Sequence, residues 1–292
     1  MKTKLYYFPA ITLLLLACSA TASAQTILLS ADNFAILGQT TITNNGPTTL
    51  INGNVGLSPG TSITGFQAVD GGTAVVVNGS VIIGGTATQA VADMNTAYVG
   101  LAGMPSNTDL SNQDLGGMTL FPGVYTFGVA ATQALSTTLT LDAQGKNGVF
   151  WVFQMADTLV TGANTNILLI NTGTHNGSDD GIFWEAHTAI TFGANSVEMG
   201  NYLAGTSITY GGTTSGQGVR AFSQAAITLD SNSINTQSAA NGNGDFTGGL
   251  RYSNTGSIIP IPEPAAFLWL APLGAMGFVL GRRRLAARKN LT

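Results

Sequence analysis

An internal repeat between residues 189 and 232 is the feature that most constrains the fold of this chain. Residues 189–195 align with residues 207–213, eighteen positions later, and with residues 226–232, nineteen positions after that. A weaker fourth copy occupies residues 158–164. Short segments repeating at such a period are typical of a solenoid, in which each coil stacks on its neighbours. The repeat therefore predicts a β-solenoid.

Alternation within each copy assigns its side chains to the two sides of a strand. Successive residues of a β-strand point to opposite faces, so the second and fourth residues of a copy share one side. The third residue is a threonine in all three main copies, and we expect it to face solvent. The second and fourth residues should form two inward ladders: Ile190, Ile208 and Ile227, and Phe192, Tyr210 and Leu229.

Residues 25–257 are expected to form one domain of strands and turns with a single helix. The segment is rich in Thr, Val, Ile and Gly, and its short alternating runs are broken by Gly and Asn, as in strands joined by turns. The exception is residues 86–104, where apolar side chains recur at helical spacing. They are Ala87, Val91, Met94, Tyr98 and Leu101.

The charge distribution excludes nucleic acid as a partner. Between Gln25 and Ile259 the chain has thirteen acidic and three basic residues, a net charge of −10. A surface of that sign repels phosphate groups. The chain is nevertheless 44% hydrophobic, so its low content of charged residues does not indicate disorder.

The residue types that metal binding and nucleophilic catalysis require are scarce. The chain has two histidines, His175 and His187, and its single cysteine, Cys18, lies in the N-terminal segment. The chain therefore offers few zinc ligands, and no nucleophile motif lies near His187. We expect both histidines to lie in loops or on the surface.

One acidic cluster could in principle serve a glycosidase, which needs paired carboxylates. It consists of Asp179, Asp180 and Glu185. The run at 176–181 is either a simple turn or a calcium-binding loop, and the turn is the simpler interpretation. We expect no catalytic residue, no metal site and no cofactor.

The N-terminus resembles a secretory signal. Residues 1–24 begin with two lysines, continue with an apolar run and end in Ala-Ser-Ala at 22–24, which suits cleavage before Gln25. The alternative is a lipoprotein signal, with the lipid attached to Cys18. After cleavage before Gln25 the mature chain would contain no cysteine.

Residues 258–292 resemble the PEP-CTERM sorting signal of Gram-negative bacteria. Pro-Glu-Pro at 262–264 precedes an uncharged run of 17 residues at 265–281 and three arginines at 282–284. The run is at the short limit for a transmembrane segment, and the arginines would lie on the cytoplasmic side. The resemblance implies transient anchoring in the inner membrane, cleavage by an exosortase, and a secreted or cell-surface protein. A plain C-terminal anchor is the alternative.

Further segments, spread over about residues 30–237, carry a second resemblance. They are NFAIL at 33–37, INGNVGLSPG at 51–60, DLGG at 114–117, LFPGVY at 120–125, VFWVFQ at 149–154 and ITLD at 227–230. Together they resemble the microbial ice-binding proteins. The resemblance implies an all-β fold, a right-handed parallel β-solenoid that is triangular and discontinuous, with coils out of sequence order and one long α-helix packed alongside. The helix expected at 86–104 fits that helix.

The resemblance also implies a secreted protein that binds ice, as an antifreeze or an inhibitor of ice recrystallisation. Its partner would be ice or ordered water, held on a flat, weakly charged face by threonine methyl and hydroxyl groups. Threonine on an exposed strand is, however, also explained by its β propensity. The alternative is a non-catalytic structural or adhesive protein of the extracellular polysaccharide matrix, with exopolysaccharide as partner. A carbohydrate-active enzyme is the third interpretation.

The expected ice contacts come from the repeat and from a pattern that the resemblance supplies, Thr-Ala/Gly-x-Thr/Asn. The sequence TGAN at 161–164 matches this pattern fully, whereas the other copies carry Phe192, Tyr210 or Leu229 in place of its first threonine. The expected contacts are Thr161, Asn164, Thr191, Asn195, Ser207, Thr209, Thr213, Thr228 and Asn232.

Overall fold

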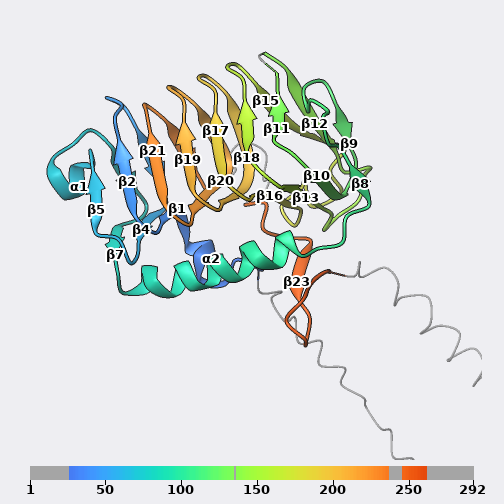
Figure 1. Ribbon diagram of the computed structural model, residues 1–292, viewed down its shortest axis with the longest axis horizontal. Helices are drawn as coiled ribbons and strands as arrows, with labels where there is room; N and C mark the ends of the chain where they lie inside the picture. The colour runs from blue at the N-terminus through green and yellow to red at the C-terminus, as the bar shows by residue number, and fades with distance from the viewer. Residues whose placement is uncertain (1–25, 135, 237–244, 262–292) are drawn as a thin grey trace, which may run out of the picture.

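The computed structural model describes residues 26–134, 136–236 and 245–261. They form a parallel β-solenoid with one long helix along its side (Figure 1), which confirms the expected fold class. The expected signal peptide with Cys18 and the expected transmembrane run at 265–281 lie outside these residues. None of the helices in the described part of the chain is both long and apolar enough to cross a membrane.

The first face of the solenoid is a seven-stranded parallel sheet. Strands β17, β19 and β21 are the three main copies of the repeat, and they pair in register through Ile190, Ile208 and Ile227. The predicted stacking of the copies is thus confirmed. In spatial order the sheet contains β11 (Ala131–Gln133), β14 (Leu159–Thr161), β17 (Ala189–Phe192), β19 (Ser207–Tyr210), β21 (Ala226–Leu229), β2 (Thr41–Asn44) and β5 (Ser62–Thr64).

A second, larger parallel sheet bends around a corner and supplies the other two faces. The helix face, which the long helix covers, contains β8 (Thr108–Asp109), β10 (Gly123–Phe127), β13 (Phe150–Met155), β16 (Gly181–Ala186), β1 (Phe34–Gly38), β4 (Asn54–Leu57) and β7 (Val81–Ile83). The mixed face contains β9 (Thr119–Leu120), β12 (Thr138–Asp142), β15 (Asn166–Ile170), β22 (Ser233–Asn235), β3 (Leu50–Asn52) and β6 (Val75–Val77).

Two long strands, β18 (Val197–Ala204) and β20 (Ser215–Ser223), cross the corner and belong to both of these faces. Gly200 lies at the bend of β18, where the pairing register shifts, and has φ +99°. A Cβ atom at this position would lie 2.6 Å from the side chain of Ile182 in the next coil. The corner therefore requires glycine for both its backbone conformation and its close packing.

The coils do not stack in sequence order. Strands β1 and β2, near the start of the chain, pair with β20 and β21 of the last repeat. The N-terminal coils, which include the short helix α1 (Gln67–Asp70), thus extend the stack beyond the repeat. Helix α2 (Thr86–Ala102) then returns along the solenoid toward β8 at the opposite end (Figure 1). It ends two residues before the expected Met104, and its five predicted apolar residues are all buried.

Apolar side chains form two cores, one inside the solenoid and one between the helix face and α2. Strand β13 contributes to both, because its side chains alternate. Trp151 and Phe153 point into the solenoid, whereas Phe150 and Val152 pack on the helix side. One side of this strand therefore faces the interior of the solenoid and the other faces the helix.

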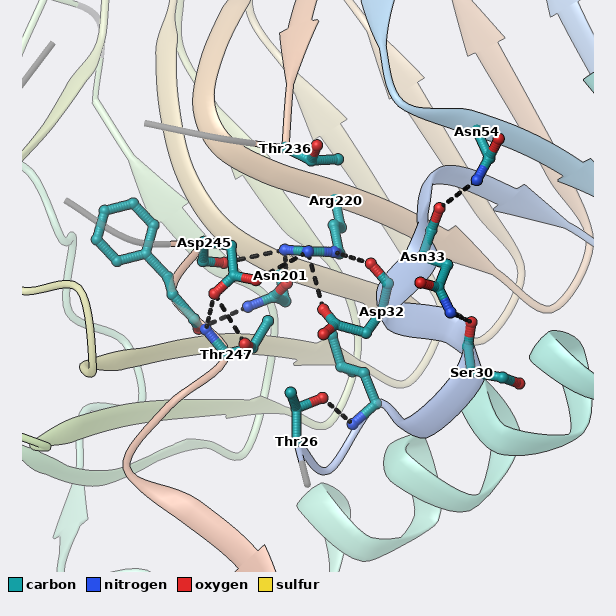
Figure 2. Close-up of polar contacts among 12 residues, drawn as sticks. Thr26, Ser30, Asp32, Asn33, Asn54, Asn201, Arg220, Thr236, Asp245 and Thr247 are labelled. Carbon is teal, nitrogen blue, oxygen red and sulfur yellow. Dashed lines mark hydrogen bonds and ion pairs between the residues drawn. The ribbon is translucent and has the colours of Figure 1, made fainter. Parts of the chain in front are cut away.

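A buried arginine joins both ends of the described chain to the solenoid (Figure 2). Arg220, on β20, is 4% exposed, and its Nη2 lies 2.8 Å from Asp32 Oδ1 and 3.1 Å from Asp245 Oδ2. Asn201 Nδ2 donates a hydrogen bond to the Phe246 carbonyl at 2.7 Å. A buried charge is destabilising unless it is paired in this way. The network therefore holds the N-terminal 3₁₀-helix η1 (Leu29–Asn33) and the segment after residue 244 against β20.

The described fold continues past the domain boundary expected at residue 257. Strand β24 (Ile258–Pro260) pairs antiparallel with β23 (Leu250–Tyr252), and the Ile258 side chain is buried in the core under α2. The Ile261 N–H donates a further hydrogen bond to the Gly249 carbonyl at 2.9 Å. Residues 258–261 therefore belong to the solenoid domain and not to the C-terminal segment.

Candidate functional site

The solvent side of the seven-stranded sheet is a regular surface that we call the threonine face. One outward residue from each strand aligns with its neighbours in register across the whole sheet. The column consists of Thr132, Val160, Thr191, Thr209, Thr228, Thr43 and Thr64. The predicted outward orientation of Thr191, Thr209 and Thr228 is confirmed, with the first two exposed and the third half-buried.

A second outward column runs parallel to the first and contains only small side chains. It consists of Ala189, Ser207, Ala226, Thr41 and Ser62. No position in either column carries a charged group. The side chains of the face therefore differ little in height, and the face has hydroxyl and methyl groups but no ions.

The backbone sets the spacing of this surface. Neighbouring strands lie about 4.8 Å apart, and alternate residues along one strand lie about 6.7 Å apart. The two columns therefore form a two-dimensional grid. Within the threonine column, Thr64 Oγ1 donates a hydrogen bond to Thr43 Oγ1 at 3.4 Å, so these two neighbouring hydroxyl groups face each other.

The layer beneath the threonine face is densely packed. Ile190, Ile208 and Ile227 are fully buried below the strands, as predicted. The rings of Phe192 and Tyr210 are in contact, with centroids 4.6 Å apart. Because protein interiors are packed about as densely as organic crystals, this layer keeps the strands above it from shifting independently.

Charged groups near the threonine face lie at its margins and are hydrogen-bonded. Asp114 borders the terminal strand β11, where its Oδ2 accepts a hydrogen bond from Thr132 Oγ1 at 2.7 Å. Asp157 precedes β14, and its Oδ1 accepts one from Thr188 Oγ1 at 2.8 Å. The centre of the face is thus uncharged.

The expectation that Thr161 contacts ice is wrong, because its side chain points into the solenoid. Thr161 is 4% exposed, and its Oγ1 donates to Glu198 Oε1 at 3.3 Å and accepts from the Gly193 N–H at 3.2 Å. Phe192, Tyr210 and Leu229 take the equivalent inward position and are also buried. The departure from the Thr-Ala/Gly-x-Thr/Asn pattern therefore falls in the core and leaves the exposed column intact.

The expectation for Asn232 is also wrong, because the repeat alignment slips by one residue in its turn. The pairing of Ser215 with Ser233 sets Asn232 beside Thr214, not beside Thr213. Asn232 is 1% exposed, and its Nδ2 donates to the Gly211 carbonyl at 2.8 Å. Its side chain therefore links two coils and cannot reach the surface.

The other three turn residues of the expected set lie beside the threonine face. Asn164, Asn195 and Thr213 are exposed and have φ between +56° and +61°, the left-handed conformation of the turns after β14, β17 and β19. The Asn195 N–H donates to the Gly212 carbonyl of the next coil at 3.0 Å, and Thr213 Oγ1 donates to Asn195 Oδ1. These residues form a polar ladder along one edge of the sheet.

The N-terminal coils supply a part of the threonine face that the sequence repeat did not predict. Thr41, Thr43, Ser62 and Thr64 continue both columns past β21, and Thr132 ends one of them on the other side. A signal was present, because Thr-Ile-Thr at 41–43 and Ser-Ile-Thr at 62–64 match Ser-Ile-Thr at 207–209. It was missed because these copies are far from the repeat in sequence.

The acidic cluster proposed for a glycosidase does not converge. Asp180 immediately precedes β16 and Glu185 lies near the far end of that strand, so their backbones are about 16 Å apart at 3.3 Å per residue, farther than the carboxylate pairs of glycosidases. Burial raises the pKa of Asp180 to about 6 and that of Glu185 to about 7. Asp179 pairs with His175 at 2.7 Å on the surface. Within the described residues, no three His, Cys, Asp or Glu side chains are grouped to hold a metal ion.

Comparison with known proteins gives consistent matches. The family model described as ice-binding-like matches residues 36–235. The ice-binding protein of Nostoc sp. (strain HG1) is 40% identical over 220 residues, which cover 74% of this chain and 76% of that protein. The ice-binding protein of Flavobacterium frigoris (strain PS1) is 32% identical over 231 residues, 74% of this chain and 79% of the relative.

Solved structures share the same architecture. The ice-binding protein of the Antarctic ascomycete Antarctomyces psychrotrophicus superposes with a TM-score of 0.64 at 34% identity, covering 72% of this chain and 97% of that one. An ice-binding protein from an Antarctic biological consortium has a TM-score of 0.64 at 32% identity, with coverages of 72% and 90%. The family model spans well over half of the chain, and the Nostoc relative is similar over most of its length. The chain therefore belongs to the ice-binding-like family.

Proposed function

We propose that this protein binds ice through its threonine face. The observation that carries the proposal is the unbroken register of the exposed column, in which six of seven positions are threonine and the seventh, Val160, has nearly the same shape. The relatives that bear the name ice-binding protein support the proposal. The expected activity is that of an antifreeze or an inhibitor of ice recrystallisation.

The mechanism requires binding and no catalysis. The threonine methyl groups order the adjacent water, and the hydroxyl groups anchor it, so that a layer of ice-like water on the grid merges with a crystal. An ion in the centre of the face would hold water tightly in another orientation, and neither column contains one. The central contacts are Thr191, Thr209, Thr228 and Ser207, and the N-terminal coils extend the area through Thr43 and Thr64.

We propose further that the ends of the chain serve export. The signal-like residues 1–24 and the PEP-CTERM-like residues 262–292 support a route through the inner membrane of a Gram-negative bacterium, transient anchoring, cleavage by an exosortase and release or retention at the cell surface. Deleting Pro-Glu-Pro at 262–264 should leave the uncleaved chain in the membrane fraction. An unchanged mass and location would contradict the sorting signal.

The ice-binding proposal is tested with one bulky substitution on each of two exposed faces. In purified residues 25–261, Thr209→Tyr should abolish thermal hysteresis and recrystallisation inhibition, because the ring breaks the flat centre of the column. The matched control is Gln217→Tyr, at an exposed position of the mixed face, which should leave both activities unchanged. Both variants should keep their stability within about 0.5 kcal/mol, as is usual for exposed sites.

Each failure points to a different interpretation. Full activity in Thr209→Tyr would remove the threonine column as the site and direct attention to the edge that carries Asn164, Asn195 and Thr213. No activity in the unsubstituted domain, even at high concentration, would instead leave the non-catalytic matrix protein, with exopolysaccharide as its partner.

A further inference from the structure

An uncharged apolar groove lies where the described chain ends. It encloses about 810 Å³ between the C-terminal end of α2, the start of β10 and the hairpin of β23 and β24. Val99, Met104, Phe150 and Ile259 are among its lining residues, and none of the described residues that line it is charged. This is notable in a domain with thirteen acidic residues.

The rim of the groove carries the two most exposed large apolar side chains in the described part of the chain. Val99, on α2, is 68% exposed, and Phe121, beside the groove-lining Pro122, is 49% exposed. Large exposed apolar patches mark contact surfaces in soluble domains. The groove and this rim together form a surface that we call the apolar rim.

The sequence that follows the groove bears on what covers it. Residues 262–264 alone separate Ile261 from the uncharged run at 265–281. An extended chain spans at most about 3.6 Å per residue, so the run starts no more than about 14 Å from Ile261. If the run spans a bilayer, the apolar rim is held within reach of the lipid headgroups.

We infer that the apolar rim docks on the surface of the lipid bilayer while the protein is anchored, an inference that rests on the anchoring proposed above. The acidic domain is repelled by anionic lipids, and the apolar rim is a part of its surface that can approach them without bringing a charge. Val99 and Phe121 insert at the boundary between headgroups and acyl chains. Because the groove lies on the α2 side, docking leaves the seven-stranded sheet with its threonine face exposed (Figure 1).

The test uses the full chain in bilayer nanodiscs of brominated lipids, which quench nearby fluorophores. In a Cys18→Ser background, single cysteines are introduced as Val99→Cys, Phe121→Cys or, as a control on the mixed face, Gln217→Cys, and each is labelled with an environment-sensitive dye. Dyes at Val99 and Phe121 should be quenched several-fold more than the dye at Gln217. Trp269 reports anchoring in the same sample, because it lies in the uncharged run and the other tryptophans, Trp151 and Trp184, are buried in the core.

The outcomes distinguish a failure of membrane docking from a failure of the proposed membrane anchoring. Quenching of Trp269 without quenching at Val99 and Phe121 overturns docking and leaves the anchor in place. Absence of quenching at Trp269 overturns both. The dye at Val99 could instead be shielded equally in lipid-free protein and in nanodiscs, without quenching by lipid. That result overturns docking, because the chain's own apolar run would then occupy the groove. Ice activity is measured separately, so none of these results depends on it.

Discussion

The threonine face and the mixed face are two exposed surfaces of one solenoid, and they share a backbone but not a surface chemistry. On the mixed face a column of outward residues also aligns in register across seven strands. It consists of Thr138, Asn166, Val197, Ser215, Ser233, Leu50 and Val75. Parallel strands give both faces the same strand spacing, so stacking alone does not distinguish them.

The difference lies in the uniformity of the side chains. On the mixed face Leu50 and Leu168 are 44% and 45% exposed, and they stand among shorter polar residues. On the threonine face Val160 is the single large apolar residue in the column, and it replaces a threonine of similar shape. The solenoid therefore supplies a lattice on every face, and the sequence makes one of them flat.

The largest expected effect comes from substitutions in the core that both faces share. Ile208 lies beneath the threonine face and Ile234 beneath the mixed face, and each is at most 1% exposed. Ile208→Asp and Ile234→Asp should both unfold the protein, because an unpaired buried charge costs an amount comparable to the whole free energy of unfolding, about 5–15 kcal/mol. Circular dichroism during thermal melting measures the loss.

The control for this prediction keeps the site apolar. Ile208→Val removes one methylene group and should cost about 0.5–1.5 kcal/mol. A folded Ile208→Asp protein with a normal melting transition would show that water can enter the core beneath the threonine face and solvate the charge. The flatness of that face would then need another explanation.

The sequence predicted those parts of the fold that repeat locally. Ile190, Ile208 and Ile227 recur at nearly constant spacing, so alternation sufficed to orient them and the threonines beside them. The spatial neighbours of Thr228 could not be predicted in the same way. Thr43 lies beside it only because the N-terminal coils stack on the last repeat in space. The order of the coils is set by tertiary packing.

The errors at Thr161 and Asn232 have local causes. Pattern matching placed Thr161 outward, although its strand has the same alternation as its neighbours and sets it opposite to Val160. The turn after Leu229 is one residue shorter than the turns after Phe192 and Tyr210. Counting residues from the start of each copy therefore aligned Asn232 with Asn195, because a gap of one residue cannot be detected in a short repeat. Sequence periodicity fixes strands more reliably than the turns between them.

The second prediction concerns a contact that joins the two faces inside the solenoid. Glu198 lies on the part of β18 that belongs to the mixed face and is 1% exposed. Its Oε2 accepts a hydrogen bond from Tyr202 Oη at 2.9 Å, and its Oε1 contacts Thr161 of the sheet under the threonine face. Burial raises the pKa of this carboxyl group from 4.5 to about 7. Below pH 7 the buried group is therefore neutral.

The sign of the pH effect follows from proton uptake. Between about pH 4.5 and 7 the folded state keeps a proton on Glu198 that the unfolded state has lost, so the free energy of unfolding falls as pH rises through this window. The contribution is full below pH 4.5 and is lost above 7, a change of about 3 kcal/mol at 1.36 kcal/mol per pH unit. Urea denaturation of the wild type and of Glu198→Gln across this range measures the difference.

Two comparisons make this prediction specific. Glu198→Gln should remove its part of the pH dependence while keeping the hydrogen-bonding capacity of the side chain. Glu185→Gln is the parallel case, because burial also raises the pKa of Glu185, on β16 of the helix face, to about 7, and it should remove a separate part of the pH dependence by the same linkage. Equal curves for wild type and Glu198→Gln would mean that folding does not raise the pKa of Glu198, and the contact would then not titrate in this window.

The smallest expected effect comes from completing the threonine column. Val160 is 42% exposed and lies in register between Thr132 and Thr191, and Val160→Thr replaces one methyl group with a hydroxyl. Because both side chains are β-branched and the site is exposed, stability should change by no more than about 0.5 kcal/mol. Recrystallisation inhibition should rise modestly, since the hydroxyl fills the one gap in the threonine column. Val197→Thr is the matched control, since the same exchange is made at a 38% exposed position of the mixed face, and it should leave ice activity unchanged.

An equal gain in both variants would mean that added hydroxyl groups help wherever they are placed, and the distinction between a uniform and a mixed face would lose its functional meaning. A gain confined to Val160→Thr would instead tie activity to the uniform threonine column, which the mixed face lacks.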